Sequence, residues 1–171
     1  MHFCTVIPNL FRDPFLYVYI LMTLYISGFN MSLKPQWLFN QSGVIPFRRE
    51  EGKIRIMLIT SRRRKRWVIP KGVIEPHLSP QESAVNEAHE EAGIKGHISP
   101  ETVGEYRYHK WGGVCTVRVF LFEVEEIAED WPEAHMRKRK WMSVQEAEKL
   151  VDEQFLKEMI RKVPELISQK Q

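Results

Sequence analysis

Apolar residues follow a strand-like pattern through much of the chain after residue 37. Between Lys53 and Ser61 they fill every second position from Ile54 to Leu58, and the positions between them are mixed. This segment therefore predicts a strand with one buried face and a second face that is partly buried. Glycine-containing loops at 50–52 and 111–113 are typical of hairpin connections. The strands expected on this pattern are Ser42–Arg48, Lys53–Ser61, Trp67–Ile69, His97–His109, Val114–Val124 and Lys138–Ser143.

One helix is marked at both ends by residues that favour helix termini. Ser79 precedes Pro80 and stands three positions before Glu82, which is the spacing of a capping box with proline at the first helical position. Gly93 suits the left-handed conformation that often follows a helix. We therefore expect a helix over Pro80–Ala92.

The helices are expected to pack on the sheet through small or apolar faces. Ala84 and Ala88 lie on one side of the first helix and would let it approach the strands closely. Two more helices are expected at Val144–Leu150 and Asp152–Ser168, the second interrupted by Pro164. The docking stripe predicted for this last helix consists of Phe155, Met159, Ile160 and Val163.

Three carboxylates of the first helix fall within one turn and a half. Glu87 and Glu91 are i,i+4 neighbours, and Glu90 is i,i+3 from Glu87, so all three share a face and repel one another. A divalent cation would remove this repulsion, and hard oxygen ligands favour Mg²⁺ or Mn²⁺. The alternative is a solvated acidic face. A loop before the helix, Pro70–Gly72, offers a backbone carbonyl as a further ligand.

This stretch resembles the signature of the Nudix hydrolases. That signature is a Gly, five residues, Glu, seven residues, Arg-Glu, an aliphatic residue, any residue, Glu-Glu, any residue, Gly and an aliphatic residue. The positions of this chain that match it are Gly72, Glu87, Glu90, Glu91, Gly93 and Ile94. The resemblance implies an α/β fold, an α/β/α sandwich around a mixed sheet. It also implies cleavage of a diphosphate bond in a nucleoside diphosphate linked to another group, with Mg²⁺ or Mn²⁺ as cofactor.

Three positions depart from the signature. Leu78 stands where the first Glu is expected, Asn86 replaces the Arg, and Ala88 is smaller than the usual aliphatic residue. In the family, that Glu and Arg belong to one charge network that orients the catalytic Glu. Losing both together avoids leaving one charge unpaired in a partly buried site. The departures predict an altered site, with a non-catalytic relative as the alternative.

A narrower resemblance extends over residues 44 to 150. Short motifs look like those of the diphosphoinositol polyphosphate and diadenosine polyphosphate branch of the family, in which basic side chains hold a highly phosphorylated substrate. The motifs in this chain are Trp67–Gly72, Gly93–Gly96, Glu129–Trp131 and Arg137–Trp141.

Positive charge is concentrated in two runs although the formal net charge is only +3. Such runs usually solvate a loop, but Arg62–Arg66 and Arg137–Lys140 would flank the carboxylate helix, where basic side chains suit a polyanion. No signature of a DNA- or RNA-binding module is present, so a small phosphorylated substrate is expected rather than nucleic acid. The residues predicted to bind that substrate are Arg66, Lys71, Lys110, Arg137 and Arg139.

The resemblance assigns the remaining roles. Glu87 and Glu91 are the expected catalytic residues, and the expected metal ligands are Gly72, Glu87, Glu90 and Glu91. The general base is either Glu87 or a glutamate outside the helix, from the set Glu123, Glu125, Glu126 and Glu133. The expected function is hydrolysis of a nucleoside diphosphate derivative, a dinucleoside polyphosphate or a diphosphoinositol polyphosphate. The alternative is an inactive domain that binds nucleotide or polyphosphate as a sensor.

The two cysteines, Cys4 and Cys115, lack the spacing of a metal site and favour a cytoplasmic protein, with Cys115 packed inside a strand. We expect a monomer or a homodimer.

The first thirty residues differ in composition from the rest. Phe15–Ser27 is nearly all apolar, yet it is shorter than the ~20 residues that a membrane-spanning helix needs. We expect translation to start at Met31, so that residues 31–171 form the Nudix domain and residues 1–30 are an extension created by start assignment. The alternatives are a membrane or signal-like anchor and a genuine packed extension. No membrane contact is expected unless the extension is real.

Overall fold

The computed structural model describes residues 35–63 and 65–169. The predictions made for residues 1–30, including the apolar segment and the start at Met31, fall outside these ranges. Within the described ranges, no helix combines the length and apolar character needed to cross a membrane.

The strands form one mixed sheet with the order β3-β2-β1-β6-β5. β4 pairs with β1 and β7 pairs with β2, off this path. β1 runs parallel to β6, and the other pairings are antiparallel. The strand bounds are β1 Asn40–Glu50, β2 Lys53–Thr60, β3 Trp67–Val68, β4 Lys71–Val73, β5 Ile94–Lys110, β6 Gly113–Ile127 and β7 Arg139–Ser143.

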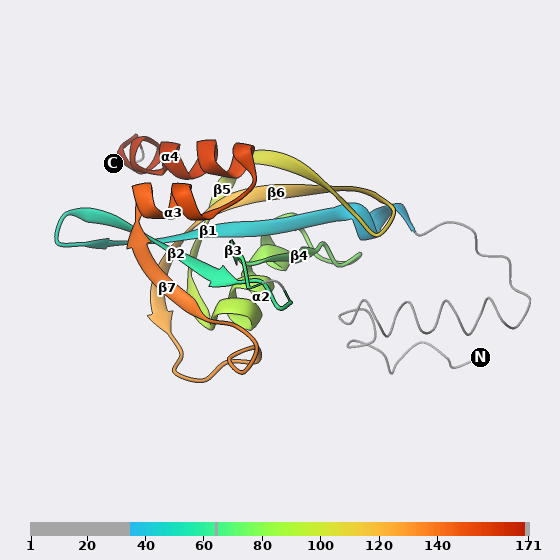
Figure 1. The fold of residues 1–171 in the computed structure, drawn as a ribbon, viewed down its shortest axis with the longest axis horizontal. Helices are drawn as coiled ribbons and strands as arrows, with labels where there is room; N and C mark the ends of the chain where they lie inside the picture. The colour runs from blue at the N-terminus through green and yellow to red at the C-terminus, as the bar shows by residue number, and fades with distance from the viewer. Residues whose placement is uncertain (1–34, 64, 170–171) are drawn as a thin grey trace, which may run out of the picture. The chain divides into compact units, whose positions relative to one another are not determined.

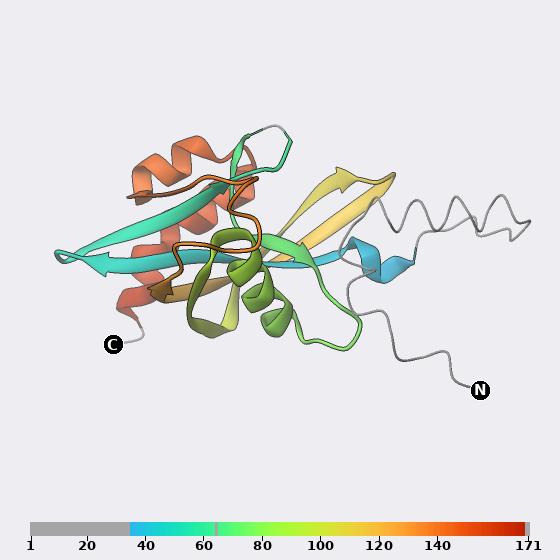
Figure 2. The same ribbon diagram turned by 90° about the horizontal axis from the view of Figure 1, so that it is seen from below.

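Helices cover both faces of this sheet. Figure 1 shows α3 (Val144–Leu150) and α4 (Gln154–Ser168) on one face and α2 (Pro80–Ala92) on the other. Figure 2, seen from below, places α2 in front of the strands. A short 3₁₀ helix, η1 (Gln36–Phe39), leads into β1. The predicted α/β/α sandwich around a mixed sheet is therefore confirmed.

The sheet separates two apolar cores, and β2 contributes to both. Ile56 and Leu58 pack with side chains of α3 and α4, whereas Met57 and Ile59 pack with Ala84 and other residues facing α2. All four β2 side chains are at most 1% exposed. The prediction of one partly buried face was wrong for this part of β2, because helices cover both faces of the sheet.

The predicted bounds of α2 are confirmed residue for residue. The Ser79 side chain accepts a hydrogen bond from the Glu82 N–H, and the Glu82 carboxylate accepts one from the Ser79 N–H, which completes the capping box. Gly93 ends the helix with φ 62°, a left-handed conformation that costs a residue with a side chain more. Ala84 and Ala88 are fully buried on the sheet side, as expected.

Two segments differ from the sequence predictions. Lys71 to Val73 forms strand β4 where a loop was expected, because its backbone pairs with β1 in the register Ser42–Gly72. α4 continues through Pro164, and its buried stripe extends on to Ile167. Phe155 is 61% exposed instead of docking, and its neighbour on the buried side is Leu156.

Replacing Ser79 with Ala should lower the free energy of unfolding by about 1 kcal/mol, because the N–H of Glu82 loses its capping acceptor. Urea denaturation measures this change. Ser143→Ala removes the equivalent cap of α3 and should cost a similar amount. An unchanged midpoint for Ser79→Ala would contradict the capping assignment.

Candidate active site

Glu87 lies directly against the backbone of β4. A Cβ atom placed on Gly72 would come within 1.8 Å of Glu87 Oε1 and 2.7 Å of Oε2. A side chain at position 72 would therefore displace the Glu87 carboxylate, since carbon and oxygen atoms do not approach this closely. Glycine at this position is thus what allows the α2 carboxylate to reach the strand.

Glu91 is buried and held from two sides. Its Oε2 accepts a 2.9 Å hydrogen bond from the backbone N–H of Lys71, and its Oε1 forms an ion pair with Arg137. Its backbone carbonyl accepts a hydrogen bond from Trp131 Nε1 at 3.3 Å. Glu91 is only 7% exposed, so these contacts replace the water that would otherwise solvate its charge.

Burial and mutual repulsion make these carboxylates hard to ionise. Burial, followed by the charges of Glu91 and Glu90, raises the pKa of Glu87 to about 8. Burial also raises the pKa of Glu91, against the opposing effects of Arg137 and the Lys71 N–H. Ionising Glu87 at the junction of α2 and β4 therefore requires more positive charge than Lys71 and Arg137 supply.

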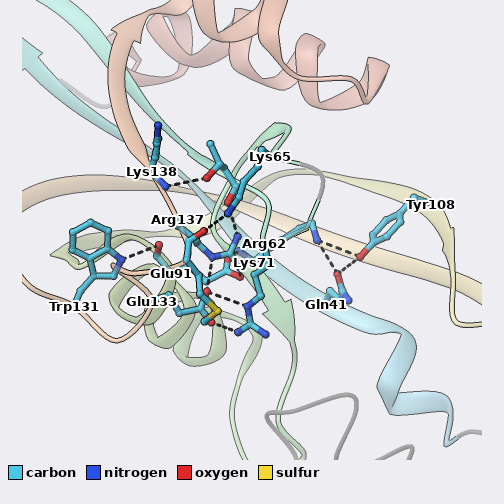
Figure 3. A network of polar contacts seen from close by, with 12 residues as sticks. Gln41, Arg62, Lys65, Lys71, Glu91, Tyr108, Trp131, Glu133, Arg137 and Lys138 are labelled. Carbon is cyan, nitrogen blue, oxygen red and sulfur yellow. Dashed lines mark hydrogen bonds and ion pairs between the residues drawn. The ribbon is translucent and has the colours of Figure 1, made fainter.

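Arg137 connects Glu91 to a wider ion-pair network. Its Nε donates to Glu133 Oε2 at 2.5 Å, and its Nη1 donates to the carbonyl of Thr60 at 2.9 Å. Arg62 also pairs with Glu133 (Figure 3). The sequence reasoning named Glu133 and Arg137 separately, as a possible base and as a substrate ligand. Their i,i+4 spacing was the one local signal that they pair.

A second group of polar residues gathers around Lys71, on the side of Figure 3 where Gln41 and Tyr108 meet. The Lys71 ammonium lies 3.2 Å from the Tyr108 hydroxyl and 3.5 Å from Gln41 Oε1. The Tyr108 hydroxyl donates to the same Gln41 oxygen at 2.8 Å. Burial, together with the charge of Lys71, lowers the pKa of Lys110 to about 8, so the two lysines crowd positive charge into one region.

The other predicted substrate ligands have partners within the protein. Arg66 pairs with Asp152 at 2.8 Å. Arg139 donates to the carbonyl of Ala92 at 2.6 Å, at the C-terminal end of α2, and stacks 3.9 Å over the Trp131 ring. The structure thus gives Arg137 and Arg139 contacts that stabilise α2. Binding of substrate by Arg66, Arg137 and Arg139 stays a prediction.

The fit of a divalent cation rests on the donor set. Within 35–63 and 65–169, no three His, Cys, Asp or Glu side chains already converge on one ion-sized position, since Glu91 faces Arg137. The donors themselves are hard oxygens. The charges of Lys71 and Arg137 offset only part of the burial and repulsion that raise the pKa of Glu87, and a cation would offset more. Ser42, the partner of Gly72 in β1, is fully buried, and among the described residues its Oγ has no hydrogen-bond partner. A polar occupant near Gly72 would satisfy it.

Comparison with known proteins identifies the family. The model of the NUDIX domain matches residues 39–163, most of the described region. The chain belongs to the Nudix family. The mouse diphosphoinositol polyphosphate phosphohydrolase 3-alpha is 31% identical over 119 residues, which are 68% of this chain and 71% of that protein. Nudix hydrolase 21, chloroplastic, of Arabidopsis thaliana is 32% identical over 69% of this chain and 62% of its own length.

The match to another Arabidopsis relative, Nudix hydrolase 13, mitochondrial, is 35% identical but covers 57% of this chain and only 53% of that protein. Among solved structures, the Ap4A hydrolase of C. elegans superposes with a TM-score of 0.64 at 23% identity, over 76% of this chain and 98% of that one. The NUDIX domain of Shewanella oneidensis NrtR, complexed with ADP ribose, gives a TM-score of 0.60 at 14% identity, over 82% of this chain and 96% of that one. These structures share the Nudix fold described above.

The raised pKa of Glu87 predicts a pH-dependent stability for this Nudix domain without metal. The folded pKa of about 8 exceeds the ordinary value of 4.5, so the folded protein holds a proton that the unfolded chain releases between these values. The resulting stabilisation is fully present below pH 4.5 and is lost as the pH rises through 8. In EDTA, urea denaturation should give a lower free energy of unfolding at pH 8 than at pH 5.

Glu87→Gln should flatten this dependence, because the amide does not titrate. Glu126→Gln, at an exposed surface pair with Lys95, is the control and should leave the dependence unchanged. Equal pH profiles for Glu87→Gln and the parent protein would show that Glu87 titrates normally.

Proposed function

We propose that this Nudix domain hydrolyses a diphosphate linkage in a small, highly phosphorylated substrate, with Mg²⁺ or Mn²⁺ bound by Gly72, Glu87, Glu90 and Glu91. The observation on which the proposal rests is the packing of the Glu87 carboxylate against the backbone of Gly72. That contact brings the acidic face of α2 to β4, where the backbone carbonyl of Gly72 would be an additional oxygen ligand. The whole activity is proposed for this chain, since its match spans little more than half of some relatives.

A divalent cation bound there supplies Lewis acidity toward the diphosphate oxygens and lowers the pKa of a bound water. The protein's own part is to present oxygen ligands in fixed positions. Each oxygen of Glu91 accepts one contact, from Arg137 or from the Lys71 N–H, which fixes the carboxylate and leaves each oxygen a lone pair for a cation. Glu87 and Glu90 share the same face of α2.

Glu87 is the general base in this proposal. Without a cation, burial and neighbouring charge raise the pKa of Glu87 to about 8. A bound cation would lower that pKa, so that the carboxylate is ionised and able to accept a proton at the working pH. Glu133 is less suited, because its oxygens already accept from Arg62 and Arg137. Two of the other glutamates considered form surface pairs, Glu125 with His97 and Glu126 with Lys95.

Lys71 and Lys110 are the proposed contacts for the substrate's phosphates. Burial, followed by the charge of Lys71, lowers the pKa of Lys110, and a bound polyanion would favour its charged form. The names of the similar proteins support a phosphorylated substrate: one acts on diphosphoinositol polyphosphate, one on Ap4A, and one holds ADP ribose. All three compounds contain a chain of two or more phosphates. The cytoplasmic location and the monomeric or dimeric state stay predictions.

A second candidate function is a sensor that binds such a compound without cleaving it. The ion pair between Glu91 and Arg137 favours it, because an arginine already neutralises one of the proposed metal ligands. Leu78 and Asn86, in place of the charged residues of the signature, favour it too.

The test is turnover of a substrate panel with Mg²⁺ by the chain and its Glu87→Gln variant. The panel contains diadenosine polyphosphates, ADP ribose, nucleoside triphosphates and diphosphoinositol phosphates. Removing the general base should lower kcat about 100-fold or more on the preferred substrate, because proton transfer contributes that much to such reactions. Phosphate or nucleotide release measures kcat, with Glu105→Gln, at an exposed pair with Arg118, as the control.

Turnover by the parent chain that survives unchanged in Glu87→Gln would remove Glu87 from the mechanism. Binding of a panel member, seen by calorimetry, without turnover by either protein would establish the sensor and overturn the hydrolase.

A further inference from the structure

We infer that Arg137 is a positioning residue: held by Glu133, it fixes the carboxylate of Glu91 in the orientation in which that group serves the site. The effect on reaction rate rests on the proposed function, whereas the effect on Glu91 itself does not. Arg137 was expected to contact substrate, but in the structure its side chain is buried and donates to other residues of the protein.

Arg137 is anchored to three separate segments. Its side chain is 6% exposed, and its Nε and both terminal nitrogens donate to different acceptors. Those acceptors are Glu133 in the preceding loop, the Thr60 carbonyl at the end of β2, and Glu91 on α2. A guanidinium is planar, so three donors directed at three fixed acceptors leave it one orientation.

Glu91 in turn depends on Arg137 for its orientation. Its Oε2 accepts from the Lys71 N–H at 2.9 Å, and its Oε1 is held by Arg137. The first contact alone would leave the carboxylate able to rotate about that hydrogen bond. Contacts to both oxygens fix the plane of the group, and misplacement of a reacting or ligating group by about 1 Å can cost about 100-fold in rate.

Glu133 makes this arrangement stable by supplying the opposite charge. Arg137 lies between two carboxylates that are 7% and 6% exposed, those of Glu91 and Glu133. Arg62 adds a second positive charge at Glu133, where it donates to both carboxylate oxygens. The charges therefore alternate along the cluster Arg62, Glu133, Arg137 and Glu91, which offsets the cost of burying each.

The arginine that pairs with Glu91 comes from outside α2. Asn86 on α2 and Leu78 in the loop before it carry no charge. The positive partner of the α2 carboxylate comes from the segment before β7, forty-six positions further along the chain. Glu91 is thus oriented by a tertiary contact and not by a residue of its own helix.

The experiment compares Arg137→Ala and Arg137→Lys with the parent chain and with Ile160→Ala. Ile160 is fully buried in α4 on the opposite face of the sheet, so its variant is a control for general destabilisation. Two quantities are measured below the melting temperature of every variant. They are the hydrogen exchange rate of the Lys71 amide, by NMR, and kcat and KM on the preferred substrate.

Arg137→Ala should speed exchange of the Lys71 amide, because Glu91 no longer holds its acceptor position, and Ile160→Ala should not. Arg137→Ala should also lower kcat about 100-fold with little change in KM. Arg137→Lys should recover only part of the rate, since an ammonium cannot hold several acceptors in one plane. Millimolar guanidinium should partly restore kcat in Arg137→Ala by entering the space between Glu91 and Glu133.

A rise in KM with unchanged kcat would overturn the inference and make Arg137 a substrate contact. Equal losses of kcat in Arg137→Ala and Ile160→Ala would reduce its role to stability. If the parent chain turns over no substrate, the proposed function fails, but the Lys71 exchange rate still decides the inference. An unchanged rate in Arg137→Ala would then show that Glu91 is not held by Arg137.

Discussion

The contact between Glu87 and the backbone of Gly72 is the feature on which the proposed cation site depends. Gly72 has no side chain, so the carboxylate of Glu87 lies against β4 in space that a Cβ atom at position 72 would occupy. Two further features make that approach possible. Ala84 and Ala88 let α2 pack closely on the sheet, and pairing with β1 holds β4 in place. The acidic face of α2 is consequently presented to a strand instead of to solvent.

Burying two carboxylates beside one another costs free energy, and the surrounding residues offset part of that cost. Glu87 and Glu91 are buried beside one another, which raises the pKa of Glu87 to about 8. The charge of Glu91 is offset by Arg137 and by the Lys71 N–H, whereas no cationic side chain among the described residues forms an ion pair with Glu87. Removing one partner of such a buried pair typically costs about 3–5 kcal/mol. The remaining repulsion at Glu87 is what a divalent cation would relieve.

Local signals in the sequence predicted the parts of the structure that depend on local interactions. α2 was placed residue for residue, because Ser79, Glu82 and Gly93 fix its ends without help from the rest of the chain. The hairpins and most strands were placed within a few residues for the same reason. The spacing of Gly72 and the three glutamates also identified the face on which the candidate site lies.

Features that depend on distant residues were missed. β4 is a strand only because β1 lies beside it, and nothing in three residues of sequence indicates that pairing. The ion pairs of Arg137 could not be predicted, because its burial is decided by Glu91 and Thr60, far away in sequence. Phe155 was placed in a core that its neighbour Leu156 occupies, since a shift of one position is enough to turn a helix face outward.

The central claim is that the packing of α2 on Gly72 creates a cation site, and Mn²⁺ binding to Gly72→Ala tests it most directly. The added methyl group would displace the Glu87 carboxylate, so calorimetry or electron paramagnetic resonance should give affinity at least about tenfold weaker than in the parent chain. Gly52→Asn, in an open turn where an added Cβ meets nothing within 4 Å, should bind as the parent does. Equal Mn²⁺ affinity in Gly72→Ala and the parent would contradict the account, because the glutamate–glycine contact would then have no part in holding a cation.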